Sequence, residues 1–285
     1  MREFPDYFAD AEQSFDDARF VIFGVPYDST SSFRFGSRLA PAEIRKASWN
    51  FESFDIFTSI DLSEIPIHDL GNLEVEDKSV LEMVQEVERV SERIIRKGKF
   101  PIALGGEHSI SIGVVESLKD AFILVLDAHL DFRERYEDNP YSHACTIRRI
   151  TDRVGVDNVL AVGIRSAGRD ELDDARREGL RFMTSRDLRK EGAEGVMDRI
   201  SGDKVYISLD FDVIDPSFAP GVSTPEPFGL RPDEVIEIIK GLSDRICGFD
   251  LVEVCPAYDT GITSVLAAKI VRMVISEVWK NKYMG

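Results

Sequence analysis

The chain has 285 residues, a formal net charge of −17 at pH 7 and a pI near 4.7. This acidic balance, without a block of Lys or Arg, disfavours nucleic acid and anionic membrane surfaces as partners, and no apolar run approaches the ~20 residues that span a membrane. The first residues lack the apolar core of a signal peptide, and three cysteines (Cys145, Cys247 and Cys255) without CxxC spacing predict a reduced, cytoplasmic protein.

Short apolar runs alternate with amphipathic stretches along the chain. The runs predicted to be strands are 19–25, 66–70, 101–104, 122–126, 158–163, 205–209 and 248–254. The clearest predicted helices are 79–97, one that opens at 231–232, and 264–282. Several strand runs are apolar throughout, which is typical of parallel strands that are covered on both faces. The alternation predicts one α/β domain over residues 1–285, a three-layer α/β/α sandwich around a mainly parallel sheet, although the pattern alone also permits a barrel.

Three ligand-type residues directly follow the predicted strand 122–126. Asp127, His129 and Asp131 stand two residues apart, so along an extended backbone their side chains project to one face. Two carboxylates and an imidazole that converge at a strand end lose hydration and repel one another unless a cation compensates them. Taken alone, the run fits a metal site and a solvated loop equally well.

A second cluster of the same design favours the metal site. Asp210 and Asp212 follow the predicted strand 205–209, and His108 follows the predicted strand 101–104 within Gly-Gly-Glu-His-Ser. Five or six oxygen and nitrogen ligands are too many for one zinc ion, which prefers about four with nitrogen and sulfur prominent. An oxygen-rich set with some imidazole suits a pair of Mn²⁺ or related divalent ions.

These motifs together resemble the ureohydrolases, the arginase and agmatinase family of binuclear manganese enzymes. The segments that carry the resemblance are 24–28, 38–45, 105–109, 127–131, 142–145, 208–221 and 250–254. They occur in this order over nearly the whole chain. The resemblance implies an arginase-like sandwich, a cationic guanidino substrate and a homo-oligomer, commonly a trimer or a hexamer.

The family likeness also implies a role for each matched residue. One Mn²⁺ would be held by His108, Asp127, Asp131 and Asp210, and the other by Asp127, His129, Asp210 and Asp212. Asp127 and Asp210 would then bridge the ions, which neutralises two close dications. The ions would make hydroxide available near neutral pH for attack on the guanidinium carbon, releasing urea and an amine.

Two further matched residues would handle the substrate. Glu253 would pair with the planar guanidinium, and His143 would carry a proton to the leaving amine, while Asp131 would also steer the proton of the nucleophilic water. A loop histidine bound to backbone is the alternative for His143, which precedes Ala144 where relatives usually have Gly. Cys145 is predicted to be a packed residue rather than a nucleophile, and His68 a packed or surface histidine.

The substrate is predicted from the residues near the matched motifs. Where arginases have polar residues for the amino-acid head group, this chain has Arg133 and Gly168, which argues against arginine. The favoured reaction is agmatine plus water to putrescine plus urea, a step of polyamine synthesis, and N1-aminopropylagmatine is a rival. Arg133 could instead pair with the carboxylate of guanidinobutyrate or formiminoglutamate.

Three remaining features of the sequence leave alternatives open. The acidic residues 134, 137 and 138 either meet a cationic tail or form a solvated turn, and Thr224 is expected at the site rim as a minor contact. A non-enzymatic relative would be expected to have lost metal ligands, and none of the six is replaced.

Overall fold

The computed structural model describes residues 4–284, and its centre is an eight-stranded sheet in which every neighbouring pair is parallel. The strand order is β4-β1-β5-β10-β9-β6-β7-β8. The strands are β1 Phe20–Val25, β4 Ile67–Asn72, β5 Phe100–Gly105, β6 Phe122–Leu126, β7 Val159–Ile164, β8 Arg181–Thr184, β9 Val205–Asp210 and β10 Ile246–Val252. Strands β2 Phe54–Asp55 and β3 Ile60–Asp61 form a separate antiparallel pair.

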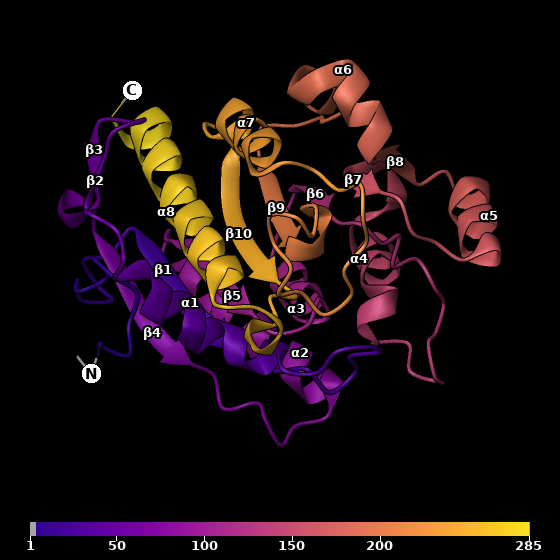
Figure 1. The fold of residues 1–285 in the computed structure, drawn as a ribbon, viewed down its shortest axis with the longest axis horizontal. Helices are drawn as coiled ribbons and strands as arrows, with labels where there is room; N and C mark the ends of the chain where they lie inside the picture. The colour runs from indigo at the N-terminus through magenta and orange to yellow at the C-terminus, as the bar shows by residue number, and fades with distance from the viewer. Residues whose placement is uncertain (1–3, 285) are drawn as a thin grey trace.

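Helices cover both faces of the sheet (Figure 1). One apolar cluster joins one face to α1 Ala40–Ser48, α6 Ser185–Met197, α7 Pro232–Leu242 and α8 Ile262–Tyr283. A second cluster joins the other face to α2 Val80–Arg96, α3 Ile110–Glu116, α4 Thr146–Val154 and α5 Arg169–Glu178. The three-layer α/β/α sandwich is therefore confirmed, and the barrel is not the fold.

Short 3₁₀ helices complete the described elements: η1 Ser37–Leu39, η2 Leu62–Glu64, η3 His143–Cys145, η4 Val156–Asn158, η5 Phe211–Val213 and η6 Pro256–Tyr258. No helix within residues 4–284 has the length and apolar character needed to cross a membrane.

The buried strands explain why the sheet forms where the sequence predicts it. Strands β1, β5, β6, β7 and β9 are buried at every residue, as expected for parallel strands with helices on both faces. Each of the seven predicted strands is present with ends shifted by at most two residues. The sequence did not reveal β8, an edge strand whose residues are mostly half-buried and of mixed polarity.

The strand order places the site. Five consecutive strands, β1, β5, β10, β9 and β6, end at one edge of the sheet, because all of them run parallel. The ends of these strands and the segments that follow them contain every predicted metal ligand, and Glu253 directly follows β10. Open parallel sheets bind ligands at this carboxyl edge.

Candidate metal centre

The six predicted metal ligands come from three of these adjacent strand ends. His108 lies in the loop between β5 and α3, Asp127 directly follows β6, and Asp210 is the last residue of β9. Their side chains are almost completely buried, whereas that of His129 is 26% exposed. Residues up to 104 positions apart in the sequence (108 to 212) thus meet at one place, because parallel pairing aligns the strand ends.

One group of ligands surrounds the ring of His108. Its Nδ1 atom lies 3.1 Å from Asp127 Oδ2, 3.2 Å from Asp131 Oδ2 and 3.3 Å from Asp210 Oδ2. Neither His108 Nδ1 nor Asp127 Oδ2 has a partner in hydrogen-bonding geometry, although both are buried. Orphaned buried polar atoms carry a large desolvation cost, and a cation among them would remove it.

A second group surrounds His129. Its Nδ1 atom lies 2.9 Å from Asp212 Oδ2 and 3.7 Å from Asp127 Oδ1. Asp127 therefore directs one carboxylate oxygen toward each imidazole, as expected of a bridging ligand. Asp210 contacts both groups as well, since its Oδ1 atom accepts a hydrogen bond from the backbone N–H of Asp212 at 2.9 Å.

Burial and like charge perturb the acidic groups of this cluster. Burial and the neighbouring carboxylates of Asp212 and Asp127 hold the pKa of Asp210 well above its usual range. Burial together with Asp127 raises the pKa of Asp131 to about 6. For Asp127 the burial is outweighed by His108 and His129, so its pKa is lowered.

The same cluster favours the protonated imidazole when no cation is bound. Burial disfavours a charged His129, but Asp212 and Asp127 outweigh it and raise the pKa of His129 to about 12. Protons on the two imidazoles thus offset the carboxylate charges that a divalent cation would otherwise balance. The donor set, with oxygen dominant, imidazole present and no thiolate, fits Mn²⁺ or a related hard divalent ion.

Glu253 and His143 lie next to the ligand cluster. Oε1 of Glu253 accepts a hydrogen bond from the backbone N–H of His108 at 2.7 Å and lies 3.3 Å from His143 Nδ1. Oε2 of Glu253 is buried without a partner. Burial opposes ionisation of Glu253, but His143 outweighs it and lowers the pKa of the carboxyl. The free oxygen and the negative charge make Glu253 a fit acceptor for a cationic N–H donor.

Asp131 and Glu253 both have a left-handed backbone, with φ of 43° and 63°. A non-glycine residue in such a conformation costs on the order of 1–3 kcal/mol unless its surroundings fix it. The backbone N–H of Glu253 donates to Gly106 O at 2.7 Å, and Asp131 O accepts from the Arg148 N–H at 3.1 Å. Strain at both predicted catalytic carboxylates indicates that their side-chain direction is imposed by the fold.

A cavity of about 180 Å³ opens on the cluster. Its lining includes the predicted ligands His129, Asp131 and Asp210, together with His143, Ser32, Arg133, Tyr136, Glu171 and Thr224. On its wall, Arg133 Nη2 lies 3.2 Å from Glu171 Oε2, and Gly168 leaves the space that the guanidinium occupies. The backbone N–H groups of Phe132 and Gly168 also donate to Glu171.

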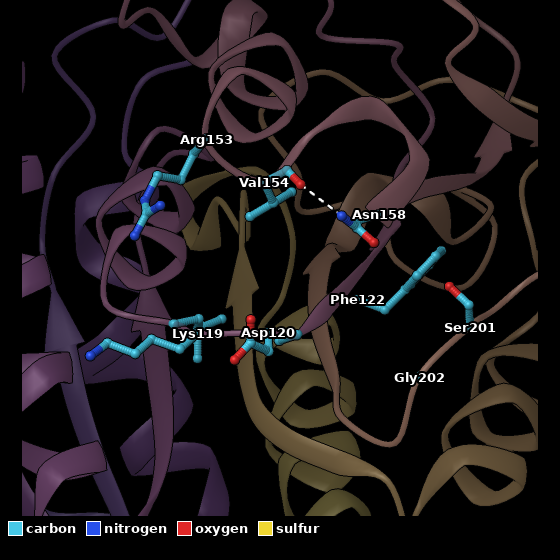
Figure 2. A pocket seen from close by; sticks show the side chains of 10 residues that line it. Lys119, Asp120, Phe122, Arg153, Val154, Asn158, Ser201 and Gly202 are labelled. Carbon is cyan, nitrogen blue, oxygen red and sulfur yellow. Dashed lines mark hydrogen bonds between the residues drawn. The ribbon is translucent and has the colours of Figure 1, made fainter.

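A larger cavity, of about 490 Å³, lies at the opposite end of β6 (Figure 2). Lys119, Asp120, Phe122 and Arg153 line it, and Phe122 is the first residue of β6, whereas Asp127 follows the last. The larger cavity is therefore separated from the ligand cluster by the length of that strand, about 16 Å at ~3.3 Å per residue. Cavity volume is therefore no guide to the position of the ligand cluster.

The structure also shows the surroundings of three residues outside the predicted ligand set, Cys145, His68 and Glu134. Cys145 is buried, and burial raises the pKa of its thiol to about 12, which argues against a nucleophile. His68 bonds to the backbone carbonyl of Gln13 at 2.6 Å, as a packed histidine does. Glu134 lies 3.3 Å from both Arg148 and Arg149 and is largely exposed, so it belongs to a solvated turn.

Sequence reasoning underestimated two hydroxyl residues of the site. Thr224 donates to Oδ2 of the predicted ligand Asp212 at 2.9 Å, so it orients a ligand rather than being a minor contact of the rim. Ser32 lies 3.1 Å from His143 and lines the cavity, and the sequence did not reveal it. Its only sequence signal is its position in the segment that follows β1.

Carboxylates and imidazoles that converge at the carboxyl edge of a parallel sheet are typical of an α/β protein with a metal centre. The chain matches the model of the Arginase family over residues 18–276 and belongs to that family. The predicted family membership is thereby confirmed.

The chain is similar to named relatives over most of its length. It is 40% identical to N(1)-aminopropylagmatine ureohydrolase of Thermococcus kodakarensis, with 89% of this chain and 88% of the relative covered. It is 35% identical to an agmatinase of Bacillus anthracis, with 93% of each chain covered. The solved agmatine ureohydrolase of Thermoplasma volcanium superposes with a TM-score of 0.94 at 42% identity, covering 98% of this chain and 96% of that chain.

Proposed function

We propose that the protein is an agmatinase-type ureohydrolase that holds two Mn²⁺ ions and hydrolyses agmatine to putrescine and urea. The observation that carries the proposal is the unpartnered Oε2 of Glu253, which lies beside a six-residue ligand cluster. Similarity to agmatinases and to an aminopropylagmatine ureohydrolase supports the substrate class.

The ligand cluster would hold the two ions in its two groups. His108, Asp131, Asp127 and Asp210 would hold one ion, and His129, Asp212 and the same two bridging aspartates the other. When bound, the pair supplies Lewis acidity and lowers the pKa of water toward neutrality. Thr224 keeps Asp212 in place through its hydrogen bond.

Glu253 would bind and orient the guanidinium. Its free Oε2 accepts an N–H of the planar cation, while the His108 N–H holds Oε1 at 2.7 Å and fixes the carboxylate plane. Asp131 lines the cavity that opens on the ligand cluster and would accept the proton of the attacking water. Fixed geometry of this kind lowers the entropic cost of reaction.

His143 would protonate the leaving amine. Burial disfavours its charged form, but Glu253, Asp131 and Glu107 outweigh the burial and raise the pKa of His143 to about 9. The imidazolium therefore persists at neutral pH and can donate a proton when the carbon–nitrogen bond breaks.

Arg133 favours guanidinobutyrate as a second candidate substrate. Its side chain is 40% exposed, whereas that of Glu171 is 5% exposed and already accepts two backbone N–H groups. An anionic tail can thus reach a cation on the cavity wall more readily than a cationic tail can reach Glu171. For agmatine, the Glu171 carboxylate balances the Arg133 charge and limits the repulsion.

Urea release from a substrate panel tests the proposal. Purified protein loaded with Mn²⁺ is assayed with agmatine, N1-aminopropylagmatine, guanidinobutyrate, formiminoglutamate and arginine, and kcat/KM is compared. We expect agmatine or its aminopropyl derivative to be the best substrate. Agmatine turning over no better than arginine would contradict the agmatinase proposal, and guanidinobutyrate as the best substrate would support the second candidate.

The Arg133→Gln variant separates the two candidates further. Removing the cation should raise KM for guanidinobutyrate and lower KM for agmatine, because only the anionic tail gains from Arg133. Metal content is measured on the same samples. Two Mn²⁺ per chain supports the enzyme, and no bound divalent ion at saturating Mn²⁺ would favour a non-enzymatic relative.

We also propose that the protein is a cytoplasmic homo-oligomer, a trimer or a hexamer as family likeness implies. Large apolar side chains that are more than half exposed support an interface between copies: Phe33, Phe35, Leu39, Phe54, Ile56, Phe57, Phe228, Ile262 and Met284. Light scattering coupled to size-exclusion chromatography measures the mass directly. A monomer at micromolar concentration would contradict this part of the proposal.

A further inference from the structure

The segment after β1 is fixed at both ends and lies against the candidate site. The side chain of Asp28 accepts hydrogen bonds from the Gly36 N–H at 2.8 Å and from Arg38 Nε at 2.6 Å, which closes residues 28–36 into a loop. Arg34 donates from this loop to the carbonyl oxygens of Pro220 and Val222, each at 3.2 Å. The loop is therefore held in place by contacts on two sides.

Thr30 connects this loop to two others. Its backbone N–H and its hydroxyl donate to the two carboxylate oxygens of Glu107, each at 2.6 Å. Its hydroxyl also accepts a hydrogen bond from the backbone N–H of His143 at 2.9 Å. The hydrogen bond to Thr30 thus fixes the backbone of His143 beside this loop. Ser32, two residues after Thr30, is thereby held close to the His143 ring.

Ser32 contacts the ring nitrogen of His143 that faces away from Glu253. Its Oγ lies 3.1 Å from His143 Nε2, while Nδ1 of the same ring faces the Glu253 carboxylate at 3.3 Å. A carboxylate beside Nδ1 keeps a proton on that nitrogen, so Nε2 is the nitrogen that gains and loses its proton. His143 is buried, whereas Ser32 is exposed and lines the cavity.

We propose that Ser32 is the proton relay that recharges His143 after each turnover. The inference rests on the proposed function, in which His143 gives its Nε2 proton to the leaving amine. A water or buffer acid in the cavity then donates a proton to Ser32 Oγ, and the Ser32 hydroxyl proton passes to Nε2. Serine ends as it began, the imidazole becomes imidazolium, and the donor loses one proton.

Steady-state kinetics of Ser32→Ala test the relay. Reprotonation follows product formation, so the variant should lower kcat and leave kcat/KM nearly unchanged. The expected loss in kcat is about 10-fold, which is smaller than the ~100-fold or more that general acid catalysis itself contributes. Imidazole buffer should restore kcat in a concentration-dependent manner, because a small acid can protonate Nε2 directly. Ser32→Thr, which keeps the hydroxyl, should retain kcat.

Ser31→Ala is the matched control. Ser31 is the preceding residue, is buried, and its hydroxyl has no hydrogen-bond partner, so the change perturbs the same loop without removing a contact to His143. Ser31→Ala should keep the wild-type kcat and show no response to imidazole. An unchanged kcat in Ser32→Ala, or a loss that imidazole does not restore, would overturn the relay.

A measurement without substrate tests the contact between Ser32 and His143, on which the relay depends. The chain has four histidines, so the ¹⁵N resonances of His143 can be assigned by comparison with His143→Gln. Ser32→Ala should shift the Nε2 resonance and leave that of His68 in place, whereas an unmoved Nε2 would contradict the contact. If the wild-type protein releases no urea from any substrate while Ser32→Ala still shifts the Nε2 resonance, the proposed function is contradicted and the contact is not.

Discussion

At the scale of single residues, the candidate site depends on carboxylates that the fold holds in unfavourable surroundings. Glu253 is buried, has a left-handed backbone and leaves one oxygen without a partner. Asp210 is buried among other acids, which raises its pKa. Groups with such perturbed environments cluster at functional sites, because stability alone would favour their replacement.

The negative charge of Glu253 should be required for full kcat/KM, and an isosteric neutral side chain should not replace it. Glu253→Gln keeps the hydrogen bond from the His108 N–H but loses the negative charge opposite a guanidinium. A hydrogen bond to a charged group contributes about 1.5–3 kcal/mol, so kcat/KM should fall by about 10- to 150-fold. Circular dichroism and Mn²⁺ content should match the wild type. A variant with wild-type kcat/KM would contradict the guanidinium-binding role.

The pH dependence of activity should report His143. Its raised pKa predicts that kcat/KM falls as the pH rises through about 9, because the imidazolium is lost there. The same shift stabilises the folded state, an effect fully present below the unfolded pKa of about 6.5 and lost as the pH rises through about 9. In His143→Gln the high-pH limb should disappear along with most of kcat. A limb that persists at the same pH in that variant would assign it to another group.

At the scale of elements, local sequence determines where helices begin and how loops pass the site. In α2 the Ser79 hydroxyl accepts from the Glu82 N–H, and the Glu82 carboxylate accepts from the Ser79 N–H at 2.9 Å, which forms a capping box. Between β5 and α3, a side chain at Gly106 would collide with the backbone of Tyr27. Gly106 thus permits the close approach of the β1 and β5 segments beside His108.

The helix cap of α2 should affect stability and not activity. Ser79→Ala removes one of the two reciprocal bonds and should lower the free energy of unfolding by about 1 kcal/mol, as N-cap deletions do. Thermal unfolding of the metal-loaded protein measures the change, and kcat/KM with the best substrate serves as the control. A lowered kcat/KM would mean that α2 is coupled to the site.

The sequence was sufficient to predict most strands and the convergence of the candidate ligand residues, but not the contacts between loops. Ligands at i, i+2 and i+4 after an apolar run were predictable, because strand geometry is local. The link from Ser32 to His143 crosses 111 residues and depends on the strand order, which no local pattern contains. Strand β8 was missed for the opposite reason, since an edge strand lacks the continuous apolar run of a buried one.

At the scale of the whole molecule, the ligand cluster connects strand ends on both sides of β10. His108 follows β5 on one side, and the remaining ligands follow β9 and β6 on the other. A cation pair held by all six residues would therefore favour the folded state over any state in which the two parts of the sheet separate. Binding that occurs only in the folded state adds stability by mass action.

Removal of metal should consequently lower the melting temperature. At an Mn²⁺ concentration 100-fold above Kd, each ion contributes about 2.7 kcal/mol, which corresponds to roughly 5–10 °C per ion for a protein of this size class. Differential scanning fluorimetry with Mn²⁺ and with EDTA measures the shift. Asp210→Asn, which weakens both predicted ion sites, should show a much smaller shift. Equal melting temperatures with and without Mn²⁺ would contradict the metal centre.

The central position of β10 has a consequence for synthesis on the ribosome. Residues 246–252 form the strand between β5 and β9, so a nascent chain that ends at residue 245 contains two half-sheets, β4-β1-β5 and β9-β6-β7-β8. The inner edges β5 and β9 are then unpaired, and unpaired edges can pair with other chains. At about 5–20 residues per second, the roughly 40 residues from the end of β9 to the end of β10 take a few seconds to add. The interval of greatest aggregation hazard for this protein therefore falls between the synthesis of β9 and the completion of β10.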